Sequence, residues 1–211
     1  MWKNFIKITL RNLTRNKVFN VINISGLAIG LASSIFIILY IINEVNYDRF
    51  HENSDRMYRM YLDGKMAGQE LKGAWNSPIF GPTFYEEMPE ISNFCRFDFW
   101  DNQLMYSNPE NKQLEGCIML ADSTFFSVFT IELLEGDPET ALDEPHSIIL
   151  SESKVPQYFP EGDPIGKAIT MNSDTTYYTV TGVVEDAPRM SHFKYDFIIS
   201  YSTSESSRRT N

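Results

Sequence analysis

The most prominent pattern in the sequence is an apolar run from Val18 to Asn43, which contains no charged residue. As an α-helix, these 26 residues would be about 39 Å long, against a hydrocarbon core of roughly 30 Å in a bilayer. A helix on the surface of a soluble protein would show a polar stripe at a period near 3.6, and this run shows none. The alternative is a buried core helix, which the length of the run disfavours. The pattern therefore predicts a transmembrane helix over residues 18–43.

The residues before this run have the pattern of an amphipathic helix. Within residues 2–15, apolar positions gather on one face and basic positions recur every four residues on another. The basic residues that precede the apolar run are Lys3, Lys7, Arg11, Arg15 and Lys17. A helix lying in the membrane interface, with its basic side toward the headgroups, fits this pattern. A basic flank that only fixes the topology is the alternative.

The charges on the two sides of the run predict its orientation. Five basic residues and no acidic one precede it, whereas Glu44, Asp48, Glu52 and Asp55 follow it. Short segments rich in Lys and Arg stay in the cytoplasm. We therefore expect residues 1–17 to be cytoplasmic and residues 44–201 to form an extracytoplasmic domain. A cleaved signal peptide has a shorter apolar core and a small-residue cleavage site, which this sequence lacks, so the run is expected to remain as an anchor.

Small residues recur at helical spacing within the predicted span. Gly26 and Gly30 form a GxxxG motif, and Ser34 extends the row by one further turn. Rows of this kind allow close approach of helices in lipid, so they indicate a packing face. Glycine and alanine are also common in spans without such a role, and the motif alone does not distinguish the two interpretations.

The sequence after the span predicts an α+β domain of mixed strands and short helices. Alternating or short apolar segments bounded by turn residues predict strands at 56–62, 94–100, 104–106, 114–120, 147–150, 168–171, 177–184 and 192–199. Residues 107–111 and 172–175 have the composition of turns, which predicts one hairpin around each.

Three short helices are expected among these strands. Phe80, Phe84 and Met88 recur every four residues and predict a helix that ends at Pro89. Asp122 is placed to cap a helix that extends to residue 129. Ser151 could cap a third helix, which Pro156 would delay or kink. The polar tail, residues 202–211, contains no apolar residue and is expected to be disordered.

Composition limits the classes of partner. The formal net charge is −10, and because the five basic residues before the span carry +5, the remainder has 13 basic against 28 acidic residues. This acidity argues against nucleic acid as a partner and against docking of the domain on anionic lipid. Hydrophobic residues make up 43% of the chain, enough for a folded core. Cys95 and Cys117 could form a disulfide, although buried thiols are the more common arrangement.

The sequence contains no constellation typical of catalysis. Gly162 to Lys167 resembles a phosphate-binding loop only superficially, because it is one residue short and is followed by Ala168 instead of a Mg²⁺-binding Ser or Thr. A turn that leads into a strand is the better interpretation. The three histidines are isolated from one another, and no metal-ligand or nucleophile motif is present. We therefore expect no enzyme activity, no cofactor and no metal.

Several stretches in order resemble one known family. They are WKNFIKITLRNLTRNKVFNVINISGLAIGLA at 2–32, NYDRFHENSDRMYRM at 46–60, DSTFFSVF at 122–129, LLEGDP at 133–138, ILSE at 149–152, YF at 158–159, DPIGK at 163–167, VTGV at 180–183 and SHF at 191–193. Together they resemble the N-terminal part of the MacB/FtsX-like family of ABC transporter permeases, with its first transmembrane helix and periplasmic core domain. The chain departs from the family pattern at 155–157, where Val-Pro-Gln stands in place of an Ala-rich helical segment.

The resemblance implies a function within a larger assembly. Permeases of this family lie in the inner membrane, do not hydrolyse ATP themselves, and transmit the motion of an ABC ATPase to their extracytoplasmic domain. Two permease subunits pair as a homodimer or heterodimer. Family members continue into a return segment and further spans, so this chain is expected to be a fragment or a short form. The alternative is a single-pass, membrane-anchored binding or sensor domain.

Overall fold

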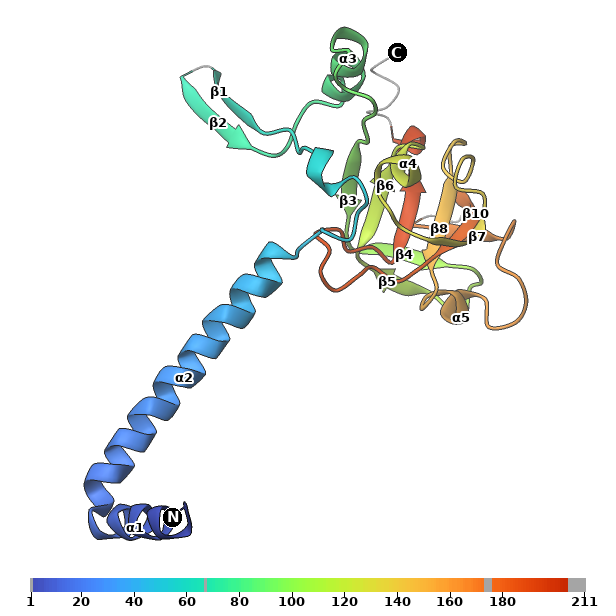
Figure 1. The fold of residues 1–211 in the computed structure, drawn as a ribbon. Helices are drawn as coiled ribbons and strands as arrows, with labels where there is room; N and C mark the ends of the chain where they lie inside the picture. Colours follow the sequence, from blue (N-terminus) through green and yellow to red (C-terminus); the bar gives the residue numbers. More distant parts are fainter. Residues whose placement is uncertain (1, 67, 173–175, 205–211) are drawn as a thin grey trace. The chain divides into compact units, whose positions relative to one another are not determined.

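The computed structural model describes residues 2–66, 68–172 and 176–204 (Figure 1). The chain divides into two compact units, Met1–Tyr47 and Asp48–Asn211. The first unit is helical, and the second contains the sheets.

The first unit consists of two helices. Helix α1 covers Trp2–Arg15, and after Asn16 helix α2 covers Lys17–Val45, 29 residues in length. Helix α2 extends the predicted span by one residue at its start and two at its end, and it is long and apolar enough to cross a membrane. None of its residues is buried in the structure, which disfavours the alternative of a soluble core helix. Both predicted helices are thus present.

The second unit is built on a mixed sheet. Among the described residues, nine strands join it, in the order β3-β6-β11-β8-β10-β9-β4-β5, with β7 paired to β10. The strands are β3 (Phe97–Trp100), β4 (Gln103–Tyr106), β5 (Gln113–Glu115), β6 (Ile118–Ala121), β7 (Leu133–Gly136), β8 (Ser147–Ser151), β9 (Ala168–Met171), β10 (Tyr177–Val184) and β11 (Phe197–Ser200). The pairs β6–β11 and β8–β10 are parallel, and the other pairs are antiparallel.

The central strands are buried on both faces of the sheet. Along β8, Ile148 and Leu150 belong to one apolar cluster, and Ile149 belongs to the other. Strands β6 and β11 alternate in the same way. The first cluster is completed by α5 (Val155–Tyr158) and the second by α4 (Phe125–Val128). Because both faces are covered, these strands are continuous apolar runs in the sequence.

Two glycines permit the close approach of β7 to β10. Gly136 lies opposite Gly182 in the antiparallel register. A Cβ atom on Gly136 would lie 2.4 Å from the carbonyl oxygen of Thr181, and the φ angle of Gly136 is +104°. Any other residue at position 136 would place its Cβ atom against this oxygen and would be strained at this φ angle. The two glycines of the LLEGDP and VTGV stretches therefore have a structural role.

Several predictions of local structure are confirmed. Strands β4 and β5 form one predicted hairpin, and β9 and β10 form the other, although residues 173–175 of its turn lie outside the described part of the chain. Helix α3 covers Phe80–Glu87, as the spacing of its aromatic residues predicts. The stretch Gly162–Lys167 is a turn before β9, in which Asp163 Oδ1 accepts a hydrogen bond from the Ile165 amide (2.8 Å).

The predicted strand at 56–62 is wrong. A single 3-10 turn covers Ser54–Arg56, and the hairpin forms later, from β1 (Leu62–Met66) and β2 (Gln69–Gly73). Opposite charges face each other across it, since Asp63 lies opposite Lys72 and Lys65 opposite Glu70. Oppositely charged cross-strand pairs of this kind stabilise the observed register.

Other predicted boundaries also require correction. The predicted strand at 114–120 is two strands, β5 and β6, because Cys117 adopts a positive φ of 53° between them. Ser151 does not cap α5, since its hydroxyl interacts with that of Ser153, and α5 begins late with Pro156 in its first turn. The predicted strand at 192–199 begins only at Phe197. Tyr201–Thr203 form a 3-10 turn at the start of the segment expected to be disordered, and residues 205–211 lie outside the described part.

Candidate functional site

The predicted packing row lies on the surface of α2. Nothing lies within 4 Å of a Cβ atom built on Gly26 or Gly30. The Ser34 hydroxyl donates to the carbonyl oxygen of Gly30 at 2.9 Å, so its polar group is satisfied within the helix. The row is therefore a smooth strip, open to a neighbouring helix, and its role as a packing face stays a prediction.

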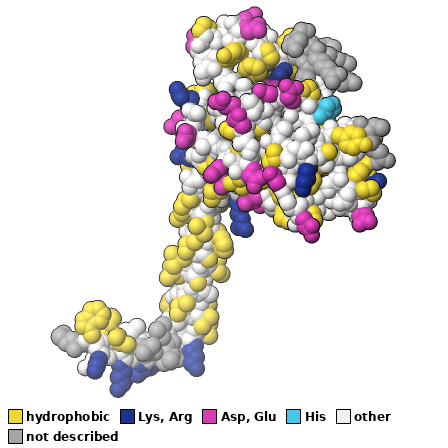
Figure 2. All heavy atoms as spheres, turned by 90° about the vertical axis from the view of Figure 1, so that its right-hand side faces the viewer, with side chains coloured by type: hydrophobic (Ala, Val, Ile, Leu, Met, Phe, Trp, Pro, Cys, Tyr) yellow, Lys and Arg dark blue, Asp and Glu magenta, His cyan; other side chains and the backbone are white. Residues whose placement is uncertain are grey.

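The predicted basic residues gather at the start of the chain. Lys3, Lys7, Arg11 and Arg15 lie on α1, and Lys17 is the first residue of α2. Figure 2 shows the dark blue side chains of Lys and Arg at this end of the helical unit and apolar side chains along α2. The separation of charge from the apolar segment is what an interfacial helix followed by a span requires. The interfacial position itself stays a prediction.

The second unit begins with a segment, residues 48–56, that we call the junction segment. Asp48 fixes its start: its N–H donates to the carbonyl oxygen of Met190, and its Oδ1 accepts from the backbone N–H of His192, both at 2.9 Å. The other carboxylate oxygen of Asp48 pairs with Nδ1 of the His192 ring. The φ angle of Asp48 is +55°, a conformation that Asp adopts more readily than most residues. The junction segment is thereby held to the loop before β11.

His51 holds the same segment at a second place. The His51 ring is buried, and its Nδ1 accepts a hydrogen bond from the Thr130 amide at 3.1 Å. In return, the Thr130 hydroxyl accepts from the Glu52 amide at 2.9 Å. Burial lowers the pKa of His51, an effect that the charge of Asp48 only partly offsets. The ring therefore binds as a neutral imidazole.

Phe129 forms the apolar part of this contact. Its ring lies in an edge-to-face arrangement with His51, at 5.3 Å between ring centroids, and it also packs on Phe125 and Phe193. These rings belong to the second apolar cluster of the sheet. The junction segment is thus joined to the core itself and not only to a surface loop.

Arg96 and Asp122 form a partly buried ion pair. Arg96 Nε and Nη2 each donate to Asp122 at 2.9 Å, and a third donor, Nη1, reaches the carbonyl oxygen of Pro78 at 3.2 Å. Asp122 therefore does not cap α4, contrary to the prediction, because its carboxylate is taken by Arg96. The guanidinium also lies 4.7 Å from the ring centroid of Tyr201. The pair connects the segment before α3 with the end of the sheet.

A second group of polar side chains, partly buried, lies beside β11. Lys154 Nζ lies 2.6 Å from Glu115 and 3.3 Å from Asp196, and the Tyr158 hydroxyl donates to Glu115 at 2.9 Å. Burial would lower the pKa of Lys154, but the hydrogen bond that Lys154 donates to Glu115 and the charge of Asp196 raise it. Burial and Glu115 raise the pKa of Tyr158. These groups satisfy one another, so we assign them a structural role.

The thiols are not paired with each other. Both cysteines are free, with Cys117 exposed and Cys95 partly buried. Burial raises the pKa of Cys95 to about 12, which makes this thiol unreactive. The expectation that both thiols are buried is therefore wrong for Cys117. In the described residues no group of three or more His, Cys, Asp and Glu side chains could hold a metal ion.

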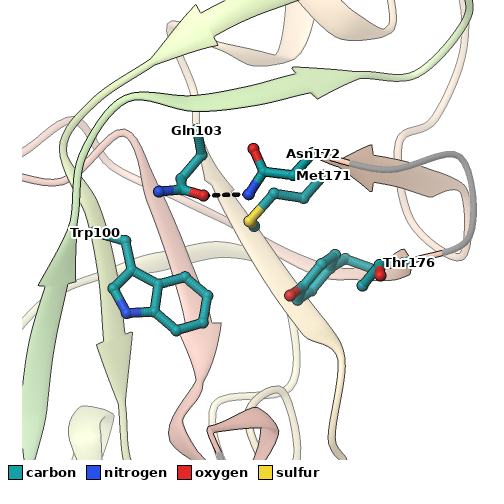
Figure 3. A pocket seen from close by; sticks show the side chains of 6 residues that line it. Trp100, Gln103, Met171, Asn172 and Thr176 are labelled. Atoms are coloured by element: carbon teal, nitrogen blue, oxygen red, sulfur yellow. Dashed lines mark hydrogen bonds between the residues drawn. The ribbon is translucent and has the colours of Figure 1, made fainter.

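An open pocket lies near one end of the sheet, with a volume of about 360 Å³. Trp100 from the end of β3 and Met171 from the end of β9 form apolar parts of its wall (Figure 3). Gln103 and Asn172 lie beside each other at the same pocket, joined by a hydrogen bond. No sequence motif indicates this site, because its residues come from β3, β4, β9 and β10 and from the positions beside them.

Comparisons with known proteins agree with the fold. A family model described as the MacB-like periplasmic core domain matches residues 21–211. Among solved structures, a domain described as part of a permease from Porphyromonas gingivalis has 23% sequence identity and a TM-score of 0.57. The match covers 68% of this chain and 60% of the Porphyromonas gingivalis domain. This chain therefore spans less than two thirds of the length of that domain. No protein of curated function matches the sequence.

Two further solved structures show weaker likeness. The periplasmic region of MacB from Actinobacillus actinomycetemcomitans has 18% identity and a TM-score of 0.47, and the match covers 61% of this chain and 56% of that one. The extracellular domain of the noncanonic ABC-type transporter YknZ from Gram-positive bacteria has 16% identity and a TM-score of 0.38. That match covers 56% of this chain and 57% of the YknZ domain.

Proposed function

The chain belongs to the family defined by the MacB-like periplasmic core domain, and we propose that it works as part of a permease subunit of an ABC transporter. In this proposal α2 crosses the inner membrane, α1 lies at its cytoplasmic face, and the second unit stands outside. A partner ATPase supplies the energy, and a second permease subunit pairs with this one. The chain carries motion and performs no chemistry of its own.

The observation that carries this proposal is the junction segment. In a subunit that transmits motion, the first residues of the outer domain after the span need to be held firmly by the rest of that domain. Here Asp48 and His51, which follow α2 closely in the chain, are bonded to distant residues at two places, 130 and the loop that contains 190 and 192. A passive tether would be expected to be a flexible, polar or Gly-rich segment with few contacts.

The orientation can be tested by labelling of engineered cysteines from outside. Cys117→Asn removes the exposed thiol and tolerates its positive φ, and Cys95 stays because it is unreactive. In this background, Glu110→Cys places one reporter in the second unit, and Asn4→Cys places another on α1. In cells whose outer barrier has been opened, a membrane-impermeant maleimide should label position 110 at once. Position 4 should react only after the inner membrane is permeabilised, and the reverse order would contradict the proposed orientation.

The partners require a separate experiment. The full chain, tagged and gently extracted from its native membrane, should co-purify with a P-loop ATPase and with a permease subunit. That complex should hydrolyse ATP, while the purified chain alone should not. Turnover by the chain alone would refute the assignment of hydrolysis to a partner. The predicted orientation without any co-purified ATPase would favour the anchored binding or sensor domain instead.

A further inference from the structure

The described residues that line the pocket near the end of the sheet are all uncharged. The pocket opens where β3 and β9 end and where β4 and β10 begin, and it measures about 360 Å³, within the range of roughly 300–1,000 Å³ typical of ligand pockets. Its lining consists of Trp100, Gln103, Met171, Asn172, Thr176 and Tyr178. Apart from the first 17 residues, the chain has 28 acidic and 13 basic side chains, so an uncharged pocket is distinct from its surroundings. It suits a neutral ligand.

The two amide side chains of the pocket are fixed in orientation. Asn172 Oδ1 accepts a hydrogen bond from the Leu104 amide at 2.9 Å, and its Nδ2 donates to Gln103 Oε1. Gln103 Nε2 in turn donates to the carbonyl oxygen of Asp101 at 2.8 Å. Each amide nitrogen carries two hydrogens and each amide oxygen accepts two bonds, so both residues keep donor and acceptor capacity beyond these contacts. The pair presents donors and acceptors side by side in a set geometry.

The apolar wall is equally fixed. Met171 and Tyr178 are buried in the first apolar cluster, and the half-buried Trp100 packs against the same cluster. The Tyr178 ring is further held by His146, edge to face, at 5.3 Å between ring centroids. A ligand would therefore meet an aromatic and thioether surface that needs no rearrangement, which reduces the entropy lost on binding.

These features together select one ligand class. A pyranose ring has a face of C–H groups, which packs on an indole, and an edge of hydroxyls, which both donate and accept hydrogen bonds. A peptide strand would need a free strand edge, but β9 is already paired with β10 and β4. On β3, the N–H of Phe99 is taken by the Asp98 carboxylate at 2.8 Å. We propose that this pocket binds a neutral sugar unit of an oligosaccharide, with Trp100 as the stacking surface and Gln103 and Asn172 as the hydroxyl readers.

The binding can be measured through Trp100 itself. The chain has three tryptophans, and because Trp2 and Trp75 are 81% and 61% exposed, Trp2→Phe and Trp75→Phe leave Trp100 as the sole reporter. The full chain is held in an amine-oxide detergent, since detergents with sugar headgroups would compete. The probes are β-1,4-linked glucose and N-acetylglucosamine oligosaccharides and α-1,4-linked glucose oligosaccharides, each from one to four units. At least one series should give a saturable shift of the Trp100 emission.

Two pocket variants and a matched control test the assignment. Asn172 has a φ of +58°, so Asn172→Gly keeps the backbone and removes only the amide, and it should weaken binding about tenfold or more. Gln103→Met is the second pocket variant, with the same expected loss. The control is Tyr177→Ala, since the 59% exposed Tyr177 precedes Tyr178 on the opposite face of β10 and should leave binding unchanged.

Thermal unfolding of each variant, measured in the same detergent, identifies any that fail to fold. A folded pocket variant that binds as tightly as the control would overturn the proposal. So would the absence of a saturable response to every series up to its solubility limit. Neither outcome affects the proposed role in a permease, because this experiment needs no ATPase.

Discussion

Replacement of Asp48 would release the junction segment from the sheet domain. In the structure the Asp48 carboxylate accepts the backbone N–H of His192 at 2.9 Å and pairs with the ring of the same residue. The Asp48 amide donates to Met190, a bond that any residue at position 48 can keep. Asp48 also occupies the left-handed region, with a φ of +55°. Asp48→Ala therefore removes the side-chain bonds and adds backbone strain, whereas Asp48→Gly removes the bonds alone.

The magnitudes follow from these contacts. A hydrogen bond to a charged group contributes about 1.5–3 kcal/mol, and the ring pair adds little because the side chain of His192 is 65% exposed. A left-handed φ costs a residue with a Cβ about 1 kcal/mol. We expect a loss of about 2 kcal/mol for Asp48→Gly and about 3 kcal/mol for Asp48→Ala. At about 1.4 kcal/mol for each factor of ten, these losses correspond to roughly 30-fold and 100-fold changes in local opening.

Hydrogen exchange read by mass spectrometry on the full chain in detergent measures this opening. Peptides that cover residues 48–56 and 188–194 should exchange fastest in Asp48→Ala, more slowly in Asp48→Gly and slowest in the wild type. Peptides from β8 and β11 should keep the wild-type rate in both variants. Asp48→Asn is the matched control, since Asn tolerates a positive φ and keeps an acceptor, and its effect should be the smallest of the three. If Asp48→Ala leaves the junction peptides unchanged, or accelerates β8 and β11 equally, the junction segment is not held as a separate unit by Asp48.

Two further predictions concern His51 and the span. The folded-state pKa of His51 is lowered, so below about pH 6.5 the unfolded state binds more protons than the folded state, and stability falls as the pH drops through the folded pKa. His51→Gln should remove this part of the loss. The difference in thermal midpoint between wild type and His51→Gln should therefore shrink as the pH is lowered from about 7.5 to about 5.5. A difference that stays constant over this range would contradict the prediction. In the membrane, Gly30→Ile should weaken self-association of α2 in a helix dimerisation assay and Ile37→Leu should not, because only position 30 lies on the smooth strip. Equal signals from the two variants would show that the strip is not a packing face.

The two N-terminal helices and two of the hairpins could be predicted because their signals are local. The length and polarity of residues 18–43 define α2, and a turn between two apolar segments defines each of the hairpins β4–β5 and β9–β10. The break between β5 and β6 was missed although a local signal exists. Cys117, with its positive φ, is not a residue type that marks a turn. Gly116, directly before it, does indicate a break in a strand, and the apolar run begins only at Ile118.

The role of Asp122 shows a second limit. An acidic residue just before a short aromatic segment has the local pattern of a helix cap, and the sequence offers no competing signal nearby. Its actual partner, Arg96, lies 26 positions earlier in the sequence. Asp122 accepts two hydrogen bonds from the Arg96 guanidinium and one from the Arg96 amide, and these three bonds outweigh a single helix cap. A pattern that considers only neighbouring residues cannot include this competition. The pocket residues Trp100 and Asn172 are missed for the same reason, since only the sheet brings them together.

The predicted strand at 192–199 starts too early because its first residues take part in other contacts. Phe193 and Tyr195 alternate with polar residues as a strand would, but His192 binds Asp48 and Phe193 packs on Phe129. The contact of His192 with Asp48 joins residues that are 144 positions apart in the sequence. The stretches NYDRFHENSDRMYRM and SHF, which carry part of the family resemblance, contain the two sides of this contact. In this chain the residues at these positions form a tertiary contact that holds the start of the sheet domain, and the proposed transmission of motion from a span would depend on such a contact.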